Sequence, residues 1–304
     1  MEYKRMYREA RYALSPRKGG WETMRIYEIL ASGSVPFIKD VDAIPGGALA
    51  FLDKELIRHA MALPGVDHVN LRVHDRTFQF ETYEMLAAAL LRHTQQRLST
   101  EALARYMLAA VGRPHATHVL YVANCGHGDY QCYLSLHGLR SILGTGLVDV
   151  PKLPYMYRPH LRAMEEMQRT TVCPQPLCTV LTGSFSRPVV KSHGAQSPVY
   201  GGGFSYGFRL EEVALNRSQT LIMRQIRGRE FDLVVFGNAE LQDFRDDATG
   251  RLIRRLWELI QHHYTPGETL VIDGRDPPKH AGFHPGVEPL AARAQYFLRE
   301  IPEC

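Results

Sequence analysis

Short apolar runs alternate with segments of helical periodicity through the second half of the chain. In these runs apolar residues follow one another without a polar face, which is typical of strands buried on both sides in a parallel sheet. We expect strands at 119–122, 147–150, around 181, 231–236, 269–272 and 296–301, with helices at 130–143, 218–229 and 252–264. This alternation predicts an α/β fold with a Rossmann-like, doubly wound parallel sheet.

The beginning of the chain mixes the same two patterns over a shorter length. We expect, in order, a helix at 2–14, a basic turn at 15–20, a helix at 21–32, a strand at 35–38 and a helix at 52–63. Gly33 suits the C-cap of the second of these helices. Because these elements make up only part of an α/β domain, the region is interpreted as a partial α/β subdomain.

The length of 304 residues suggests about two domains, since domains of about 150 residues are common. Residues 64–80 are polar and rich in turns, and helical spacing returns from Phe80 to Val111. We therefore divide the chain into a subdomain at 1–63, a helical connector at 64–114 and a Rossmann-like domain at 115–304. Residues 151–203, rich in Pro, Ser and Gly, are expected to form long loops.

The composition is that of a folded protein, with 45% hydrophobic and 22% charged residues. It excludes disorder, collagen and coiled coil as descriptions of the whole chain. The formal net charge of +4 suits an anionic ligand. Because no basic stripe accompanies this charge, we expect no nucleic-acid partner.

The cysteines form no CxxC pair with the spacing of zinc ligands. We therefore expect free thiols in a reducing compartment, and a cytoplasmic location. The start of the chain carries no apolar signal core, and no apolar run is long enough to span a bilayer. An integral membrane segment is not expected. The five cysteines are Cys125, Cys132, Cys173, Cys178 and Cys304.

The segment 15–38 carries the sharpest candidate chemistry. Lys18, Gly19 and Gly20 precede a predicted helix, where free backbone N–H groups and the helix dipole favour an anion such as a diphosphate. Arg25 and Glu28 share one face of that helix, and a carboxylate there could accept hydrogen bonds from ribose hydroxyls. The alternative interpretation is a plain Gly-Gly turn followed by a surface ion pair between Arg25 and Glu28.

The run from Lys18 to Ile38, KGGWETMRIYEILASGSVPFI, resembles the donor-site segment of GT-B glycosyltransferases of the exostosin-like and related group. In that group the pattern is R-x-x-E-x-hydrophobic-A-x-G-hydrophobic-x-P. The resemblance implies that Glu28 binds the ribose of a nucleotide sugar. It also implies that Arg25 and Lys18 neutralise the diphosphate, with Gly19 and Gly20 allowing its close approach.

Motifs in residues 117–301 are similar, as an ordered set, to the Rossmann-like half of the same glycosyltransferase-like proteins. They include HGDY at 127–130, LHGL at 136–139, GGGFSY at 201–206 and IDGRD at 272–276. In that family this half precedes the donor segment, whereas here it follows. The resemblance therefore implies a GT-B-like plan with its halves in permuted order, or a fragment of a longer protein.

His127 and Asp129 are the candidate catalytic residues. They follow the strand at 119–122, where the first domain of a GT-B enzyme meets its acceptor, and either side chain could act as general base. Asp129 could instead be the N-cap of the helix that follows.

Four other features are weaker candidates. Residues 273–276 could face an interdomain cleft or form a turn, and Asp42 is expected to be a solvated loop residue. The adjacent His262 and His263 cannot share one helical face, so we expect no metal site there. The glycines at 201–203 lack the GK[ST] sequence of a P-loop.

Together these observations predict transfer of a sugar from a nucleotide-diphosphate sugar to a hydroxyl acceptor, which could be a glycan, a protein or a small molecule. No cofactor or metal is expected, because Lys18, Arg25 and the helix N-terminus would stabilise the departing diphosphate. The alternative is a non-catalytic glycosyltransferase-like scaffold or binding module. A nicotinamide-dependent enzyme is disfavoured, because residues 124–128 lack the third glycine of G-x-G-x-x-G.

Overall fold

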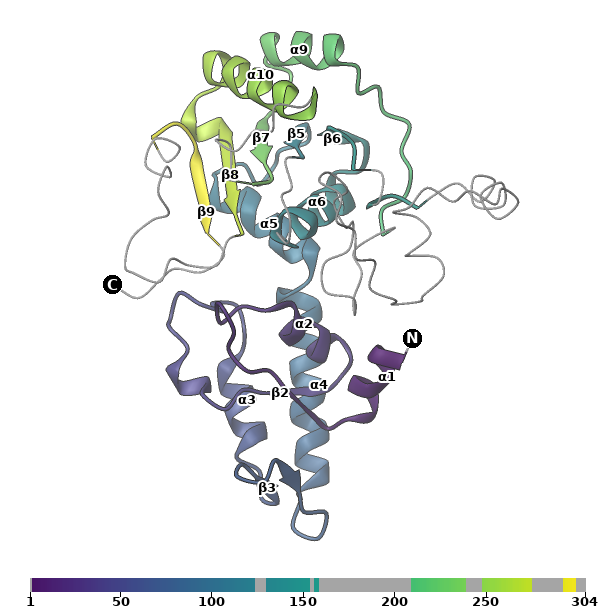
Figure 1. Cartoon of the computed structure of the whole chain (residues 1–304), viewed down its shortest axis with the longest axis vertical. Helices are drawn as coiled ribbons and strands as arrows, with labels where there is room; N and C mark the ends of the chain where they lie inside the picture. Colours follow the sequence, from purple (N-terminus) through teal and green to yellow (C-terminus); the bar gives the residue numbers. More distant parts are fainter. Residues whose placement is uncertain are drawn as a thin grey trace, which may run out of the picture.

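The computed structural model describes residues 2–123, 130–153, 156–158, 209–238, 248–274 and 292–298. Within them the chain forms two α/β units joined through two consecutive helices, α4 (Phe80–Arg97) and α5 (Thr100–Ala110). Figure 1 shows the N-terminal unit in purple and blue below the sheet unit in teal, green and yellow.

A parallel sheet forms the centre of the second unit, as the sequence predicts, and the described residues contribute five strands to it. The strand expected around 181 lies outside the described residues. The five described strands are β5 (Val119–Val122), β6 (Leu147–Val150), β7 (Leu233–Phe236), β8 (Thr269–Asp273) and β9 (Gln295–Leu298). They lie in the order β6-β5-β7-β8-β9, and every neighbouring pair is parallel. Numbered along the chain this is the doubly wound order 2-1-3-4-5.

Helices cover both faces of this sheet. Along β5, Val119 and Tyr121 pack in the core with α5 and α6 (Tyr130–Leu143), while Leu120 and Val122 pack on the other side. The second face is covered by α9 (Gln219–Arg227) and α10 (Ala248–His263). Because all four residues of β5 are buried, the unbroken apolar runs are explained by burial on both faces. This arrangement is compatible with a Rossmann-like sheet.

The N-terminal unit contains a small parallel sheet. Strands β1 (Tyr12–Leu14) and β2 (Val35–Phe37) pair in parallel, and helix α2 (Met24–Ala31) connects them. The helix expected at 2–14 is therefore wrong in its second half, since α1 (Glu2–Glu9) ends before β1. The cause is tertiary, because Tyr12 and Leu14 take partners in β2, far along the chain.

The rest of the N-terminal unit is helical apart from one hairpin. A 3₁₀ turn, η1 (Val41–Ala43), precedes helix α3 (Lys54–Met61), where the Asp53 carboxylate caps the helix by accepting from the Leu56 N–H at 3.0 Å. The polar segment predicted at 64–80 contains a hairpin of β3 (Val66–Asp67) and β4 (Arg72–Val73).

The predicted connector contains two helices that belong to different units. Helix α4 packs against α2 and α3 of the N-terminal unit, whereas α5 packs closely against α6 of the sheet unit. Gly138 of α6 allows this close approach, because a Cβ at that position would lie 1.9 Å from the carbonyl oxygen of Thr100. The α4–α5 junction therefore couples the positions of the two units.

Candidate functional site

The loop predicted to bind a diphosphate connects the carboxyl end of β1 to the amino end of α2. In a parallel β-α-β unit, ligands bind at this end of the strand, where the N–H groups of the helix N-terminus are free. The helix begins at Met24, a few residues later than expected, with Thr23 as N-cap. The Thr23 side chain makes no cap hydrogen bond, and its buried Oγ1 has no hydrogen-bond partner in the part of the chain that the structure describes.

Three cations gather along this loop and the first turn of α2. Lys18 is exposed and Arg25 is half-buried, and the Arg17 guanidinium lies over the Trp21 ring at 4.9 Å from its centroid. Among the described residues none of the three cations has an ion-pair partner. Sequence reasoning did not single out Arg17, whose only signal was its position beside Lys18.

The two predicted glycines shape a tight turn. The Lys18 N–H donates to the carbonyl of Gly20 at 3.3 Å, which folds the loop back on itself. Gly19 is exposed and Gly20 is buried. The loop therefore presents Lys18 and Gly19 to the solvent while Trp21 anchors it in the core of the N-terminal unit.

Glu28, the predicted ribose ligand, is only 6% exposed. It forms no ion pair with Arg25, although both residues are described, so the alternative of a surface ion pair does not apply. Its backbone carbonyl accepts from the Ser32 hydroxyl at 2.8 Å. The structure thus places Glu28 on the buried side of α2, one turn from the half-buried Arg25.

This loop contacts the sheet unit at the start of α6. The Tyr130 hydroxyl donates to the carbonyl of Glu22 at 2.9 Å, and the Gln131 amide donates to the Glu22 carboxylate at 3.4 Å. Met24 packs against the core beneath α6. Helix α6 follows β5, the strand at which the order of the sheet reverses. The structure therefore brings the predicted donor loop to the carboxyl end of β5, the expected ligand position in such a sheet.

The backbone at this end of the sheet is tightly packed. A Cβ on Gly237, directly after β7, would lie 2.4 Å from Cys132 Sγ and 2.6 Å from the Tyr121 hydroxyl oxygen. That hydroxyl donates to the Cys132 carbonyl at 2.7 Å. Asn238, the next residue, is 2% exposed. These contacts fix the backbone at this end of the sheet.

The predicted catalytic residues His127 and Asp129 lie outside the described residues. Helix α6 begins at Tyr130, so neither the role of general base nor the alternative of an N-cap is tested for Asp129. Residues 201–203 and 275–276 also lie outside the described part of the chain. Asp273, at the end of β8, is 1% exposed and accepts a hydrogen bond from the Tyr296 hydroxyl through Oδ2.

A buried charge cluster that sequence reasoning missed lies on β6. The Asp149 carboxylate is fully buried, and its Oδ1 accepts from Arg140 and from Arg217, each at 2.7 Å. Tyr157 completes the cluster, with its hydroxyl 3.2 Å from Arg140 Nη2, and burial raises the pKa of this phenol to about 12. The cluster joins β6, α6 and the segment that leads into α9. Its only sequence signal was an aspartate inside an apolar strand.

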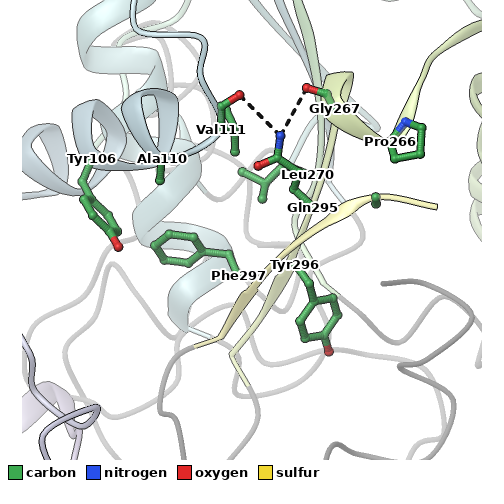
Figure 2. A pocket seen from close by; sticks show the side chains of 10 residues that line it. Tyr106, Ala110, Val111, Pro266, Gly267, Leu270, Gln295, Tyr296 and Phe297 are labelled. Carbon is green, nitrogen blue, oxygen red and sulfur yellow. Dashed lines mark hydrogen bonds between the residues drawn. The ribbon is translucent and has the colours of Figure 1, made fainter. Parts of the chain in front are cut away.

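A pocket of the described residues lies at another place. Figure 2 shows this pocket of about 580 Å³ beside β9, with Tyr106 of α5 and Phe297 lining it. The Gln295 amide spans its upper side by donating to the carbonyls of Val111 at 3.4 Å and Gly267 at 3.3 Å. It contains no charged side chain and none of the predicted site residues, so it does not suit a diphosphate.

Metal ligands are not grouped in the described residues: no cluster of three or more His, Cys, Asp or Glu side chains could hold an ion there. His262 and His263 lie at the end of α10 with their ring centroids 5.0 Å apart. Asp42 is exposed, as expected, and its carboxylate pairs with Arg58.

Cys132 is disulfide-bonded, and its partner lies outside the described residues. The expectation of free thiols is therefore wrong for this cysteine. Spacing alone could not reveal the bond, because it does not give the distance between two cysteines in the fold. In the described part of the chain no helix is long and apolar enough to cross a membrane.

Comparison with protein-family models, with curated proteins and with solved structures finds no match for this chain. The resemblance of residues 18–38 to a glycosyltransferase donor segment therefore rests on the sequence motif alone.

Proposed function

We propose that this protein is a glycosyltransferase that moves a sugar from a nucleotide-diphosphate donor to a hydroxyl acceptor. The observation that carries the proposal is the contact between Tyr130 and Glu22, which holds the cationic loop before α2 against the carboxyl end of the parallel sheet. The cations of that loop also support the proposal, because they have no ion-pair partner among the described residues. In this proposal, the parallel sheet and the donor-type loop are the two parts of a GT-B-like plan.

In this proposal the loop stabilises the leaving group. Negative charge grows on the diphosphate as the bond to the sugar breaks, and positive groups already in place lower the barrier. Lys18 and Arg25 supply full charges, and the free N–H groups of the first turn of α2 supply partial ones. Glu28 is assigned to the ribose hydroxyls, and His127 or Asp129 to removal of the acceptor proton. No metal is required for these steps.

A second candidate function is a non-catalytic binding module with a glycosyltransferase-like architecture. Two observations favour it. The N-terminal unit contains only the two parallel strands β1 and β2 in the described residues, fewer than a typical nucleotide-binding sheet. Glu28 is also only 6% exposed, so a ribose could reach it only if neighbouring side chains moved. This candidate predicts a stable fold without sugar transfer.

Calorimetric titration with UDP, GDP and their sugars distinguishes the two candidates. We expect saturable binding that weakens at least about tenfold in Arg25→Ala and in Glu28→Gln, because each removes one contact to a charged or polar ligand group. Arg255→Ala, an exposed arginine of α10, is the matched control and should bind normally. A flat titration of folded wild-type protein would support the binding module and exclude a functional donor site.

The proposed cytoplasmic location rests on the expectation of free cysteine thiols. The disulfide of Cys132 argues against this location, because disulfides are typical of oxidising compartments. Thiol titration of denatured protein, purified without reductant from its native source, decides the point. Five free thiols would support the cytoplasm, and three or fewer would support an oxidising compartment.

A further inference from the structure

The pocket of Figure 2 has the size of a small-molecule site. Its volume of about 580 Å³ lies within the range of about 300–1,000 Å³ that is typical of such sites, and every residue that lines it belongs to the described part of the chain. It lies where β8 and β9 begin, beside the C-terminal half of α5. The candidate donor loop meets the carboxyl end of β5, so the pocket lies at the opposite end of the parallel sheet.

Aromatic side chains form part of the pocket wall. Tyr106 of α5 remains 42% exposed, although its ring centroid lies 4.7 Å from that of Phe51 and 5.5 Å from that of Phe297. Both ring pairs meet edge to face, with interplanar angles of 70° and 66°. These contacts hold the Tyr106 ring in place and leave part of it open to a ligand. The face of such a ring is negative and attracts C–H groups, which carry partial positive charge.

The polar groups at the pocket are mainly hydrogen-bond acceptors. The Gln295 amide nitrogen donates to the carbonyls of Val111 at 3.4 Å and Gly267 at 3.3 Å, and these two hydrogen bonds orient the amide (Figure 2). Its amide oxygen has no hydrogen-bond partner among the described residues. Helix α5 also ends here, and the last carbonyls of a helix carry partial negative charge. The pocket therefore favours a ligand with several O–H or N–H donors.

A charged ligand finds no complement in this pocket. None of the described residues that line it is charged, so an anion would lose its hydration without gaining a cation. A cation would need a carboxylate, and the neighbouring Glu268 already pairs with Arg229 at 2.8 Å and with Arg113 at 3.4 Å. The ligand that fits the pocket is therefore neutral.

From these observations we infer that the pocket binds a neutral sugar ring of an oligosaccharide. One face of a sugar ring presents C–H groups that pack on an aromatic side chain such as Tyr106, and its hydroxyl groups donate to acceptors such as the Gln295 oxygen. A planar aromatic ligand such as indole would also pack on the aromatic wall, but its single N–H would leave most of the acceptors without a donor. The inference does not depend on the proposed transferase activity, because the pocket and the donor loop lie at opposite ends of the sheet.

Saturation-transfer NMR and calorimetric titration test this inference. The probes are maltohexaose, cellohexaose, xylohexaose and chitohexaose, with indole and a sulfated heparin hexasaccharide as comparison ligands. We expect saturable binding of at least one neutral oligosaccharide and weaker binding of both comparison ligands. Tyr106→Ala should lower the oligosaccharide affinity about threefold to tenfold, because it removes a packing contact with the sugar ring. Phe80→Ala, which removes a 48% exposed ring of the N-terminal unit, is the matched control and should bind as the wild type does.

Ala110→Trp tests the pocket without changing a buried residue. Ala110 is exposed and lines the pocket, so the larger side chain should fill the space and abolish oligosaccharide binding. Ala109→Trp is the matched control, because Ala109 is also exposed on α5 but does not line the pocket. Three results would overturn the inference: no binding of any neutral oligosaccharide, tighter binding of indole or of the heparin hexasaccharide, or an Ala110→Trp variant that binds as well as the wild type.

Discussion

The Tyr130 hydroxyl donates a hydrogen bond to the backbone carbonyl of Glu22 at 2.9 Å and so joins helix α6 to the loop before α2. These residues are 108 positions apart in the chain. Tyr130 is the first residue of α6, the helix that follows β5, and Glu22 belongs to the candidate diphosphate loop. Their contact makes a single candidate site from two units.

Replacing Tyr130 by Phe should weaken that site more than it weakens the fold. Loss of a hydrogen bond costs about 0.5–1.5 kcal/mol, so we expect the affinity for a UDP-sugar or GDP-sugar to fall about threefold to tenfold. Tyr83→Phe is the matched control, because its hydroxyl also donates to a backbone carbonyl, that of Arg11, within the N-terminal unit. Calorimetric titration of both variants measures the difference. Equal affinities for Tyr130→Phe and the wild type would show that this contact does not position the loop.

Gly237→Ala should strongly destabilise the sheet unit. The added methyl group would lie 2.4 Å from Cys132 Sγ and 2.6 Å from the Tyr121 hydroxyl, both in buried side chains that have little room to move. Overpacking of this kind costs about 1–3 kcal/mol. Gly46→Ala is the control, because nothing lies within 4 Å of its added Cβ and the stability should be unchanged or slightly higher. Urea unfolding followed by circular dichroism would measure both, and unchanged stability of Gly237→Ala would contradict the described packing.

Asp149→Asn should be among the most destabilising single substitutions in the described core. Among the described residues, it removes the only carboxylate that pairs with the guanidinium groups of Arg140 and Arg217. Breaking a buried ion pair from one side costs about 3–5 kcal/mol. The comparison is Asp42→Asn, whose ion pair with Arg58 is exposed to solvent and should contribute little to stability. The midpoint temperatures of thermal unfolding should therefore differ widely between the two variants. Similar midpoints would argue against a buried cluster.

Stability should also fall at alkaline pH, in part through Tyr83. Burial raises the pKa of this phenol to about 12, above its ordinary value of 10.0, because the charged phenolate is disfavoured in the folded state. The unfolded chain therefore loses this proton at a lower pH than the folded chain. The stabilising contribution is complete below pH 10 and is lost as the pH rises from about 10 to about 12. In urea unfolding, Tyr83→Phe should lose less stability over this interval than the wild type, and parallel pH profiles would refute the assignment.

Strands β5 and β7 of the parallel sheet were predictable from sequence because each is apolar at every position. Val119–Val122 and Leu233–Phe236 have no polar face, and only burial on both sides explains such runs. Tyr12–Leu14 was not predictable in the same way. It is too short to show a period, and its partner Val35–Phe37 lies across a helix.

For the candidate site, the sequence alone identified the residue types, which are the cations and glycines of residues 18–25 and the carboxylate of Glu28. These are local properties, since the chemistry of a glycine-rich basic loop before a helix depends only on neighbouring residues. Arg17 and Glu22 were missed because their contributions come from Trp21 and Tyr130 and not from the local pattern.

The sequence by itself determined the α/β class, the parallel sheet and the chemical character of the loop before α2, because periodicity and residue chemistry act over short distances. Only the tertiary structure decided the strand order, the burial of Glu28, the Asp149 cluster and the contact between Tyr130 and Glu22. Each of these depends on packing between segments that the fold brings together. The pattern of residues along the chain does not give the distance between such segments.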